Sequence, residues 1–406
     1  LQALHAKNPL DWVLLALPGV KHGERKNILN NIRLLKVGVR VLPTADQLMR
    51  GTADASQLQE VEIADLLGRD EIVPDEKLLH QDIEGQTILV TGAGGSIGSE
   101  LCSEILRDSP KILVLLELNE FSLYHAERTF RRVSSIPIVP CLGSVQDSEL
   151  IKHLLHDHQI NTVYHAAAYK HVPLVEENPL EGLRNNALGT RTLVEKCIEA
   201  EVSSFVLIST DKAVRPTNVM GASKRIAELI VQDTARRFPE RKLGIVRFGN
   251  VLDSSGSVVP LFREQIKKRS PITVTHPEIT RYFMSIGEAA RLVIQAGAMS
   301  KNGEVFLLDM GQPVKIKDLA LQMIELSGLV PEKDIPLQYT GLRPGEKLYE
   351  ELLIDPAQSQ PTLHPRIFCS EEPLPEVKVL EKEISILTEA IEQRDISNAL
   401  ASMKRL

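Results

Sequence analysis

The sequence predicts an α/β protein with a doubly wound parallel sheet, a partial βαβ segment before it and a smaller mixed α/β lobe after it. The main observation is a series of short apolar segments separated by helical patterns, which is typical of strands buried on both faces of a parallel sheet. These strand candidates are residues 87–91, 111–116, 136–140, 161–165, 204–209 and 242–247. The second observation is that this alternation weakens after about residue 248. There we expect short strands at 272–275, 304–308 and 337–339, and helices at 286–299 and 315–328.

Composition excludes several classes of protein. A net charge of -7 and a pI of about 5.9 argue against a nucleic-acid partner, because phosphate backbones require a basic face. The four cysteines show no C-x-x-C spacing, and histidines and acidic residues do not cluster at ligand spacing, so we predict no metal site. Scattered thiols suggest a reducing compartment. No apolar run reaches the length of roughly 18 residues that a membrane span requires, and no signal peptide opens the chain.

The strongest local motif is the segment TGAGGSIG at residues 91–98, which follows a predicted strand and opens a helical pattern. Glycines at 92, 95 and 98 allow a tight turn, and they let backbone N–H groups and the helix N-terminus face a pyrophosphate. Gly92, Gly95, Ser96, Ile97 and Gly98 are therefore candidate dinucleotide contacts in a Rossmann-type domain. The alternative is an ordinary glycine-rich loop.

An acidic residue follows at the end of the second strand. Glu117 lies about twenty residues after the glycines, where a carboxylate bonds the adenosine ribose hydroxyls. Asn119 is assigned to the same site, and no nearby arginine is available to pair with a 2′-phosphate. The predicted cofactor is therefore NAD, with NADP the less favoured choice. The alternative for Glu117 is an exposed acid at a strand end.

The chain of 406 residues is long enough for two or three domains. Residues 11–17 and 37–42 are predicted strands on either side of a helical pattern at 23–36, without a glycine-rich turn. The predicted division is a partial α/β segment of an upstream domain (1–50), a connector (51–85), an NAD-binding domain (86–250), a substrate-binding lobe (251–370) and a C-terminal helical segment (371–406).

Eight ordered segments carry a family resemblance. They are TGAGGSIG (91–98), HAAAYKHVP (165–173), NNALGT (185–190), STDKA (209–213), MGASK (220–224), RFGNVLDSSGSV (247–258), TRYFMS (280–285) and RPGEK (343–347). Together they resemble the membrane-linked UDP-N-acetylglucosamine 4,6-dehydratases of the extended short-chain dehydrogenase/reductase superfamily, over roughly residues 80–355. The resemblance implies a UDP-sugar substrate and a role in making surface polysaccharides. It implies C4 oxidation, loss of water across C5 and C6, and hydride return to C6, with the cofactor kept bound.

The segment STDKA supplies an acid and a base at the end of one strand, where α/β sheets place ligands. By resemblance, Asp211 is the acid toward the C6 hydroxyl, Lys212 is the base at C5, and Thr210 bonds the C4 oxygen. Adjacent opposite charges favour ionisation of both groups, which does not suit a neutral acid and a neutral amine. The alternative for an Asp–Lys pair on a loop is a solvated turn.

A missing tyrosine is the main departure from the wider superfamily. There, a Tyr four residues before the active-site Lys shares one helix face with it and accepts a proton. Lys224 is present, and by resemblance it bonds the nicotinamide ribose, but the Tyr position holds Met220. A thioether cannot act as a base. The resemblance to a long, Met-containing subgroup implies an active enzyme that retains the C5 configuration. The alternative is a chain that only binds NAD.

The remaining assigned residues surround the expected ligands. Ala166, Ala167 and Ala168 let the cofactor lie close to the backbone, and Val145 is assigned to the same site. Lys170 and His171 could reach the sugar or its pyrophosphate, although His171 could equally be a simple surface residue.

In the second lobe, Asn250, Arg281 and Arg343 resemble the nucleotide-sugar contacts of the family, and Val258 and Glu346 are assigned with them. A planar guanidinium can bond two diphosphate oxygens. The alternative for RPGEK is a helix-entry turn with solvated charges.

Three functions are therefore weighed. The dehydratase is favoured by the pair Asp211 and Lys212 together with Lys224. An epimerase or dehydrogenase acting on a nucleotide sugar would normally require the Tyr that Met220 replaces. A non-catalytic NAD-binding module is the third, and Met220 is its best support.

The expected location combines composition with the resemblance. The visible chain reads as cytoplasmic, and its first residue is Leu1 rather than Met. Full-length relatives carry membrane helices before the α/β part. We therefore expect the native protein to be tethered to the inner membrane through a missing upstream region, with this portion on the cytoplasmic face. A homo-oligomer is also expected.

Overall fold

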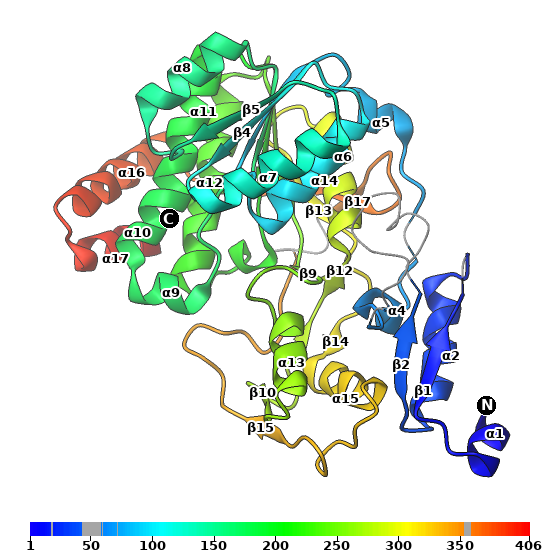
Figure 1. The fold of residues 1–406 in the computed structure, drawn as a ribbon. Coiled ribbons are helices and arrows are strands. Elements are labelled where there is room, and N and C mark those ends of the chain that lie inside the picture. The colour runs from blue at the N-terminus through cyan, green and yellow to red at the C-terminus, as the bar shows by residue number, and fades with distance from the viewer. Residues whose placement is uncertain (18, 43–57, 59, 71, 353–358) are drawn as a thin grey trace. The chain divides into compact units, whose positions relative to one another are not determined.

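The computed structural model describes residues 1–406 except 18, 43–57, 59, 71 and 353–358 (Figure 1). The chain forms two compact units, which we call the sheet unit and the small unit. The sheet unit consists of Val73–Gly249, Ile286–Asp309 and Pro344–Leu406, and the small unit of Leu1–Ile72, Asn250–Ser285 and Met310–Arg343.

A nine-stranded sheet forms the core of the sheet unit, in the order β16-β17-β13-β8-β7-β6-β3-β4-β5. Its strands are β3 (Thr87–Thr91), β4 (Ile112–Glu117), β5 (Ile138–Leu142), β6 (Thr162–His165), β7 (Ser204–Ile208), β8 (Lys242–Arg247), β13 (Val305–Leu308), β16 (Ser359–Pro361) and β17 (Ile367–Ser370). The strands from β13 to β5 pair in parallel. Strand β17 pairs antiparallel to β13, and β16 pairs antiparallel to β17. The predicted doubly wound parallel sheet is therefore confirmed.

One strand lies in a different place from the prediction. The segment 304–308 was assigned to the smaller lobe, but β13 pairs in parallel with β8 and extends the main sheet. All four of its residues are buried, because an apolar strand of this kind requires cover on both faces. The antiparallel strands β17 and β16 beyond it were not predicted.

Helices cover both faces of this sheet (Figure 1). One face carries α6 (Ser96–Arg107), α7 (Glu120–Val133) and α14 (Ile286–Met299), with α5 (Glu76–His80) packed on α14. The other carries α8 (Ser148–His158), α11 (Gly189–Glu199) and α12 (Val219–Arg237). Side-chain caps fix several starts: Asn119, Asp147 and Asn218 each accept a hydrogen bond from a backbone N–H in the first turn of their helix.

Helix α12 is almost entirely buried, because further short elements pack around it. These are α9 (Val172–Glu177), α10 (Pro179–Leu183), the π-helix η1 (Arg184–Leu188), the 3-10 turn η2 (Asp211–Ala213) and the C-terminal helix α17 (Ile396–Arg405), which pairs with α16 (Val377–Glu392). A helix that is apolar on most sides requires such cover.

The strand order reverses between β3 and β6. Such a reversal is the switch point at which open α/β sheets bind ligands, outside the carboxyl ends of the strands. The turn after β3 and the loop after β6 therefore meet where a dinucleotide would be expected.

The small unit contains the N-terminal βαβ segment and several short strand pairs. Strands β1 (Trp12–Leu15) and β2 (Gly38–Val41) are parallel, and α1 (Gln2–Lys7), α2 (His22–Arg33) and α4 (Ile63–Leu67) belong to the same unit. The other pairs are β9 (Asn250–Val251) with β12 (Phe283–Met284), β10 (Ile272–Val274) with β15 (Leu337–Tyr339), and β11 (Thr280–Arg281) with β14 (Val314–Lys315). Helices α13 (Val258–Lys267) and α15 (Ile316–Leu326) complete it.

The compact units follow different bounds from the five predicted segments. Residues 1–72 cluster with 250–285 and 310–343, whereas 286–309 and 344–406 belong with the sheet. Residues 51–57, 59 and 71 of the predicted connector lie outside the described residues. The roles assigned to those segments remain predictions.

Among the helices that the structure describes, none combines the length and the apolar character needed to cross a membrane.

Candidate active site

The turn after β3 can be built only with glycine at two positions. Gly92 has a φ of 66°, and a Cβ there would lie 2.8 Å from the Cα of Ala167. A Cβ on Gly98 would lie 2.0 Å from the carbonyl oxygen of Gly92. The chain therefore turns sharply into α6, which begins at Ser96 without a side-chain cap from any described residue. The N-terminus of a helix, where the backbone N–H groups have no partner within the helix, suits a phosphate.

A cavity of about 390 Å³ lies beside this turn, at the switch point of the sheet. Its lining includes these predicted residues: Gly92, Gly95, Glu117, Asn119, Val145, Ala166, Ala167 and Ala168. It also includes residues that were not predicted: Gly94, Leu116, Leu118, Ser122, Gly143, Ser144, Tyr169 and Asn185. Ser96, Ile97, Gly98, Lys170 and Lys224 are not part of this lining. The volume falls in the range of small-molecule sites, about 300–1,000 Å³.

Glu117 joins two loops of the cavity. Its carboxylate accepts hydrogen bonds of 3.0 Å from the N–H of Gly94 and from the N–H of Asn119. The Asn119 side chain caps α7 by accepting from the N–H of Ser122 at 2.9 Å. A carboxylate oxygen has more than one acceptor position, so Glu117 can still accept a ribose hydroxyl.

Asn186 fixes the loop after β6. Its side-chain oxygen accepts from the N–H of Tyr169 at 2.8 Å, and its amide nitrogen donates to the Tyr169 carbonyl and to Ser223 Oγ, both at 2.9 Å. Asn186 lies in the π-helix η1, and π-turns inside helices occur frequently at functional sites. The segment NNALGT drew attention in the sequence, but this clamp depends on a contact that sequence spacing does not reveal.

A buried histidine, His165, also stabilises this loop through hydrogen bonds. The Thr190 hydroxyl donates to the Asn186 carbonyl and so accepts from His165 Nε2, 2.9 Å away. The other ring nitrogen, Nδ1, then accepts from the Thr91 hydroxyl at 2.7 Å, and Thr91 Oγ1 accepts from the N–H of Ala167. Burial, followed by the charge of Lys224, lowers the pKa of His165 to about 3.

This neutral histidine predicts a pH-dependent loss of stability. The unfolded chain takes up a proton near the ordinary histidine pKa of about 6.5, whereas folded His165 does so only near 3. Its contribution to stability is therefore complete above about pH 6.5 and is lost as the pH falls toward 3, by about 2 kcal/mol at pH 5. Urea unfolding at pH 7 and pH 5 should show that H165Q loses about 2 kcal/mol less than wild type over this interval. The exposed His156 provides the control, since H156Q should follow wild type; equal losses in all three proteins would contradict the assignment.

Lys170 and His171 lie in the same loop, before α9, and have exposed side chains. Partial desolvation lowers the pKa of Lys170, and desolvation together with the charge of Lys170 lowers that of His171.

The segment Thr210–Asp211–Lys212 lies at the end of β7, as predicted. Asp211 is fully buried, and its Oδ1 accepts from the Thr210 hydroxyl and from Lys212 Nζ, both at 2.9 Å. Its Oδ2 is also buried and has no hydrogen-bond partner among the described residues. A buried acceptor of this kind costs about 1–3 kcal/mol, which a ligand hydroxyl would recover.

A second carboxylate, which the sequence did not indicate, lies near this pair. Glu350 is buried, and its Oε1 lies 3.7 Å from Lys212 Nζ. The turn RPGEK brings it there, because Gly345 O accepts from Asn218 Nδ2 and Lys347 Nζ donates to the Val214 carbonyl at 2.8 Å. Glu346 lies in that turn and is partly buried. Only proximity to a recognised motif could have pointed to Glu350, which lies three residues beyond RPGEK.

Helix α12 carries Met220 and Lys224 one turn apart, both buried. Met220 belongs to the apolar core of the unit. A Cβ on the intervening Gly221 would lie 2.2 Å from the carbonyl oxygen of Lys212, so glycine lets the helix pack directly against the segment Thr210–Asp211–Lys212. Burial lowers the pKa of Lys224 to about 8, although the charge of Glu228 counteracts this effect.

Four predicted substrate contacts belong to the small unit. Asn250 begins β9 and its N–H donates to the Tyr282 carbonyl, and Val258 begins α13. Arg281 is buried at the end of β11, while Arg343 is exposed. Their assignment to the sugar nucleotide remains a prediction.

Within the described residues, no group of histidine, cysteine and acidic side chains could hold a metal ion.

The nine-stranded sheet, the glycine turn and the lysine on α12 define a short-chain dehydrogenase/reductase. Residues 88–372 match the family model described as polysaccharide biosynthesis protein, and the chain belongs to that family.

Relatives agree with this membership. The chain is 49% identical over 345 residues to the capsular polysaccharide biosynthesis protein CapD of Staphylococcus aureus, covering 84% of this chain and 57% of that protein. It is 45% identical over 349 residues to the probable polysaccharide biosynthesis protein EpsC of Bacillus subtilis, covering 86% and 58%. The chain thus spans a little over half the length of these curated relatives. Among solved structures, Pen from Bacillus thuringiensis is similar with a TM-score of 0.67 and 32% identity, over 72% of this chain and 90% of that one.

Proposed function

We propose that this chain modifies a nucleotide sugar with a bound nicotinamide cofactor, and that it is a UDP-N-acetylglucosamine 4,6-dehydratase. The product is the UDP-4-keto-6-deoxy sugar with the C5 configuration retained. The observation that carries the proposal is the ion pair of buried Asp211 and partly buried Lys212 at the end of β7, with an Asp211 oxygen that no described residue bonds. An acid and a base in contact, in a short-chain dehydrogenase/reductase that lacks the usual Tyr, suit elimination of water better than simple oxidation.

The residues present fit NAD. The glycine turn and the start of α6 would hold the pyrophosphate, Glu117 the adenosine ribose, and Lys224 the nicotinamide ribose. Among the described residues that line the cavity there is no arginine, which favours NAD over NADP. When bound, the cofactor would supply the acceptor for hydride from sugar C4 and the donor for its return to C6.

The Thr210 hydroxyl offers a route for the C4 proton. Because it donates to Asp211 Oδ1, its oxygen can accept a hydrogen bond from the C4 hydroxyl. The proton of the C4 hydroxyl would then pass through Thr210 to the Asp211 carboxylate. This relay gives Asp211 the neutral acid form that it requires next.

Asp211 and Lys212 then act as acid and base across C5 and C6. Protonated Asp211 donates to the departing C6 hydroxyl, and neutral Lys212 accepts the C5 proton. Once Lys212 is charged, the nearby Glu350 carboxylate stabilises it, which favours the eliminated state. Return of that proton by Lys212 to the same face retains the C5 configuration.

The substrate contacts complete the proposal. Arg281 and Arg343 would bond the diphosphate, with Asn250, Val258 and Glu346 beside the nucleotide, and Lys170 and His171 near the sugar. These assignments derive from the motifs that carry the resemblance.

The biological setting is proposed from the relatives. Both curated relatives carry names in polysaccharide biosynthesis, so a role in surface glycan synthesis is expected. Attachment to the cytoplasmic face of the inner membrane, and assembly into a homo-oligomer, remain predictions. A complete reading frame without an apolar span would contradict the first.

The test is proton NMR of the full chain with UDP-N-acetylglucosamine in deuterated water, first without and then with added NAD. A new methyl signal together with a C4 ketone or its hydrate is the expected result, and the C5 coupling pattern should report retention. A change of C4 configuration without loss of water would assign an epimerase instead. Unchanged substrate under both conditions would overturn the proposed reaction on this sugar.

A further inference from the structure

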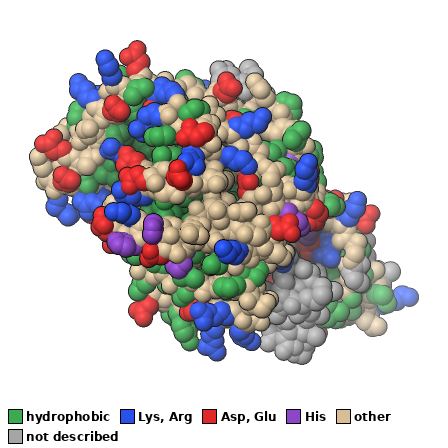
Figure 2. All heavy atoms as spheres, turned by 90° about the horizontal axis from the view of Figure 1, so that it is seen from above, with side chains coloured by type: hydrophobic (Ala, Val, Ile, Leu, Met, Phe, Trp, Pro, Cys, Tyr) green, Lys and Arg blue, Asp and Glu red, His purple; other side chains and the backbone are tan. Residues whose placement is uncertain are grey.

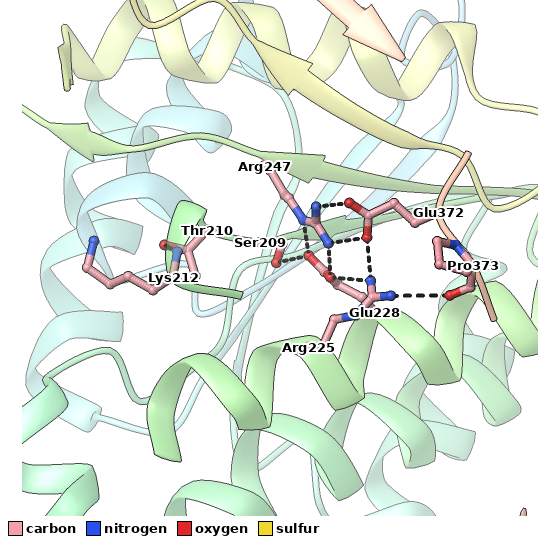
Figure 3. Close-up of polar contacts among 8 residues, drawn as sticks. All are labelled: Ser209, Thr210, Lys212, Arg225, Glu228, Arg247, Glu372 and Pro373. Atoms are coloured by element: carbon pink, nitrogen blue, oxygen red, sulfur yellow. Dashed lines mark hydrogen bonds and ion pairs between the residues drawn. The ribbon is translucent and has the colours of Figure 1, made fainter. Parts of the chain in front are cut away.

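A buried network of charged groups lies next to the catalytic segment of the sheet unit (Figure 3). Arg247, the last residue of β8, is fully buried and bonds both carboxylate oxygens of Glu228 on α12: Nε to Oε1 at 2.7 Å and Nη2 to Oε2 at 2.5 Å. Glu372, two residues after β17, accepts from Nη2 at 2.7 Å and also from Nη1. The guanidinium is therefore held by two carboxylates at once.

Arg225 makes the network electrically neutral. Its Nη1 donates to Glu228 at 3.0 Å and to Glu372 at 2.7 Å, so two arginines balance two glutamates. Glu228, Arg247 and Glu372 are buried and Arg225 is partly buried. Removing charges from water in this way is expensive, and apolar residues of similar volume are often as stable or more so. Stability alone is therefore a weak explanation for this network.

The network makes a direct contact with the catalytic segment. Ser209, the residue before Thr210, donates from its hydroxyl to Glu228 Oε1 at 2.6 Å, while its N–H donates to the Val246 carbonyl at 2.7 Å. Figure 3 shows the Ser209 hydroxyl directed at Glu228, with Thr210 and Lys212 continuing away from it. Both the backbone and the side chain at the start of the segment are thus fixed.

Glu228 also acts on the lysine of the site. Lys224 lies four residues earlier on α12, on the same helix face, and makes no hydrogen bond or ion pair in the part of the chain that is described. The titratable groups that act on its ammonium are His165, from β6, and Glu228, from its own helix. Glu228 is the one that favours the charged form.

We propose that Glu228, oriented by Arg247, is a positioning residue of this site: through Ser209 it fixes the start of the Thr210–Asp211–Lys212 segment, and it places a carboxylate one helix turn from Lys224. The geometry of one side chain thereby sets both the place of the acid–base pair and the charge offered to the cofactor ribose. The catalytic consequence rests on the proposed function, whereas the effect on Lys224 can be measured without it.

The first measurement is the titration of Lys224 in the full chain without cofactor, followed by NMR of carbon-13 labelled lysine and assigned with the variant K224M. The variant E228Q keeps the side-chain shape but removes the charge. It should lower the pKa of Lys224 by about one unit, since an opposite charge close by shifts a pKa by one unit or more. The matched control is E383Q, because Glu383 accepts from Ser402 and Arg405 in a similar arrangement between α16 and α17. E383Q should leave the Lys224 titration unchanged.

The second measurement separates positioning from folding. The variant S209A leaves the ion pairs intact but releases the strand end from Glu228, so kcat should fall about tenfold, as expected for misplaced catalytic groups. The KM and the NAD affinity should remain within twofold of wild type.

The outcomes distinguish the role of Glu228 from the proposed function. If E228Q and E383Q lose stability equally and neither moves the Lys224 titration, the network is structural only and the inference is overturned. If S209A has the kcat of wild type, the positioning role is overturned. If Lys224 titrates as expected but wild type binds neither NAD nor NADP, the proposed function fails while the charge effect of Glu228 stands.

Discussion

Replacing Asp211 by Asn is expected to lower the turnover of UDP-N-acetylglucosamine by about a thousandfold, within the range that positioned acids and bases contribute. The amide can still accept the hydrogen bonds of Thr210 and Lys212 at Oδ1, so the local structure should persist. It cannot carry a proton to the C6 hydroxyl. Product formation should be followed by the new methyl signal in proton NMR, and NAD affinity by calorimetry.

The control for this substitution is D233N. Asp233 is also a buried carboxylate of the sheet unit, and it pairs with Arg236 and Arg237 at the far end of α12. D233N should keep most of the activity, and both variants should bind NAD as wild type does, because neither residue lines the cavity. A D211N variant within tenfold of wild-type turnover would remove Asp211 from the proposed acid role.

Local pattern was sufficient to predict the parallel part of the sheet. The segments 87–91 and 242–247 coincide with β3 and β8, and the helix at 286–299 coincides with α14. Apolar strands between amphipathic helices leave few alternative arrangements, since both faces of each strand must be covered. The glycine turn was equally predictable, because backbone approach to a phosphate demands particular residues at particular spacing.

Long-range partners were not predictable in the same way. Strand β13 pairs in parallel with β8, although some sixty residues of sequence separate the two strands. Strand β17 then pairs with β13 in antiparallel orientation. Periodicity reports that a segment is buried, but it does not report which neighbour buries it. Residues 304–308 were therefore expected in the smaller lobe, whereas they form a strand of the main sheet.

The site shows the same limit. Thr210, Asp211 and Lys212 are adjacent in sequence, so one motif revealed all three. Glu350, and likewise Glu372 beside Arg247, come from distant segments, and an acidic residue in a charged stretch is more often a solvated one. Only the fold shows that these particular carboxylates are buried beside cations.

The substitution G98A tests the phosphate turn itself, and it is expected to weaken NAD binding strongly. Its Cβ would lie 2.0 Å from the Gly92 carbonyl oxygen, 2.7 Å from the Gly92 carbonyl carbon and 3.0 Å from the Ala93 Cα. All three neighbours are backbone atoms, so the turn itself must move. Because Gly92 is in turn packed against Ala167, the loop after β6 would be displaced with it. We expect NAD affinity to fall by at least about a hundredfold, as ligand contacts worth about 3 kcal/mol are lost.

The matched variant is G287A in α14. There a Cβ would meet only the ends of two flexible side chains, Arg291 and Glu100, each at 3.3 Å, and alanine favours a helix over glycine by about 1 kcal/mol. G287A should therefore bind NAD normally and be at least as stable as wild type. G98A should lose binding and product formation together, whereas D211N should lose product formation alone. If G98A bound NAD within threefold of wild type, the turn after β3 would not be the phosphate site, and the cofactor would have to be placed elsewhere in the sheet unit.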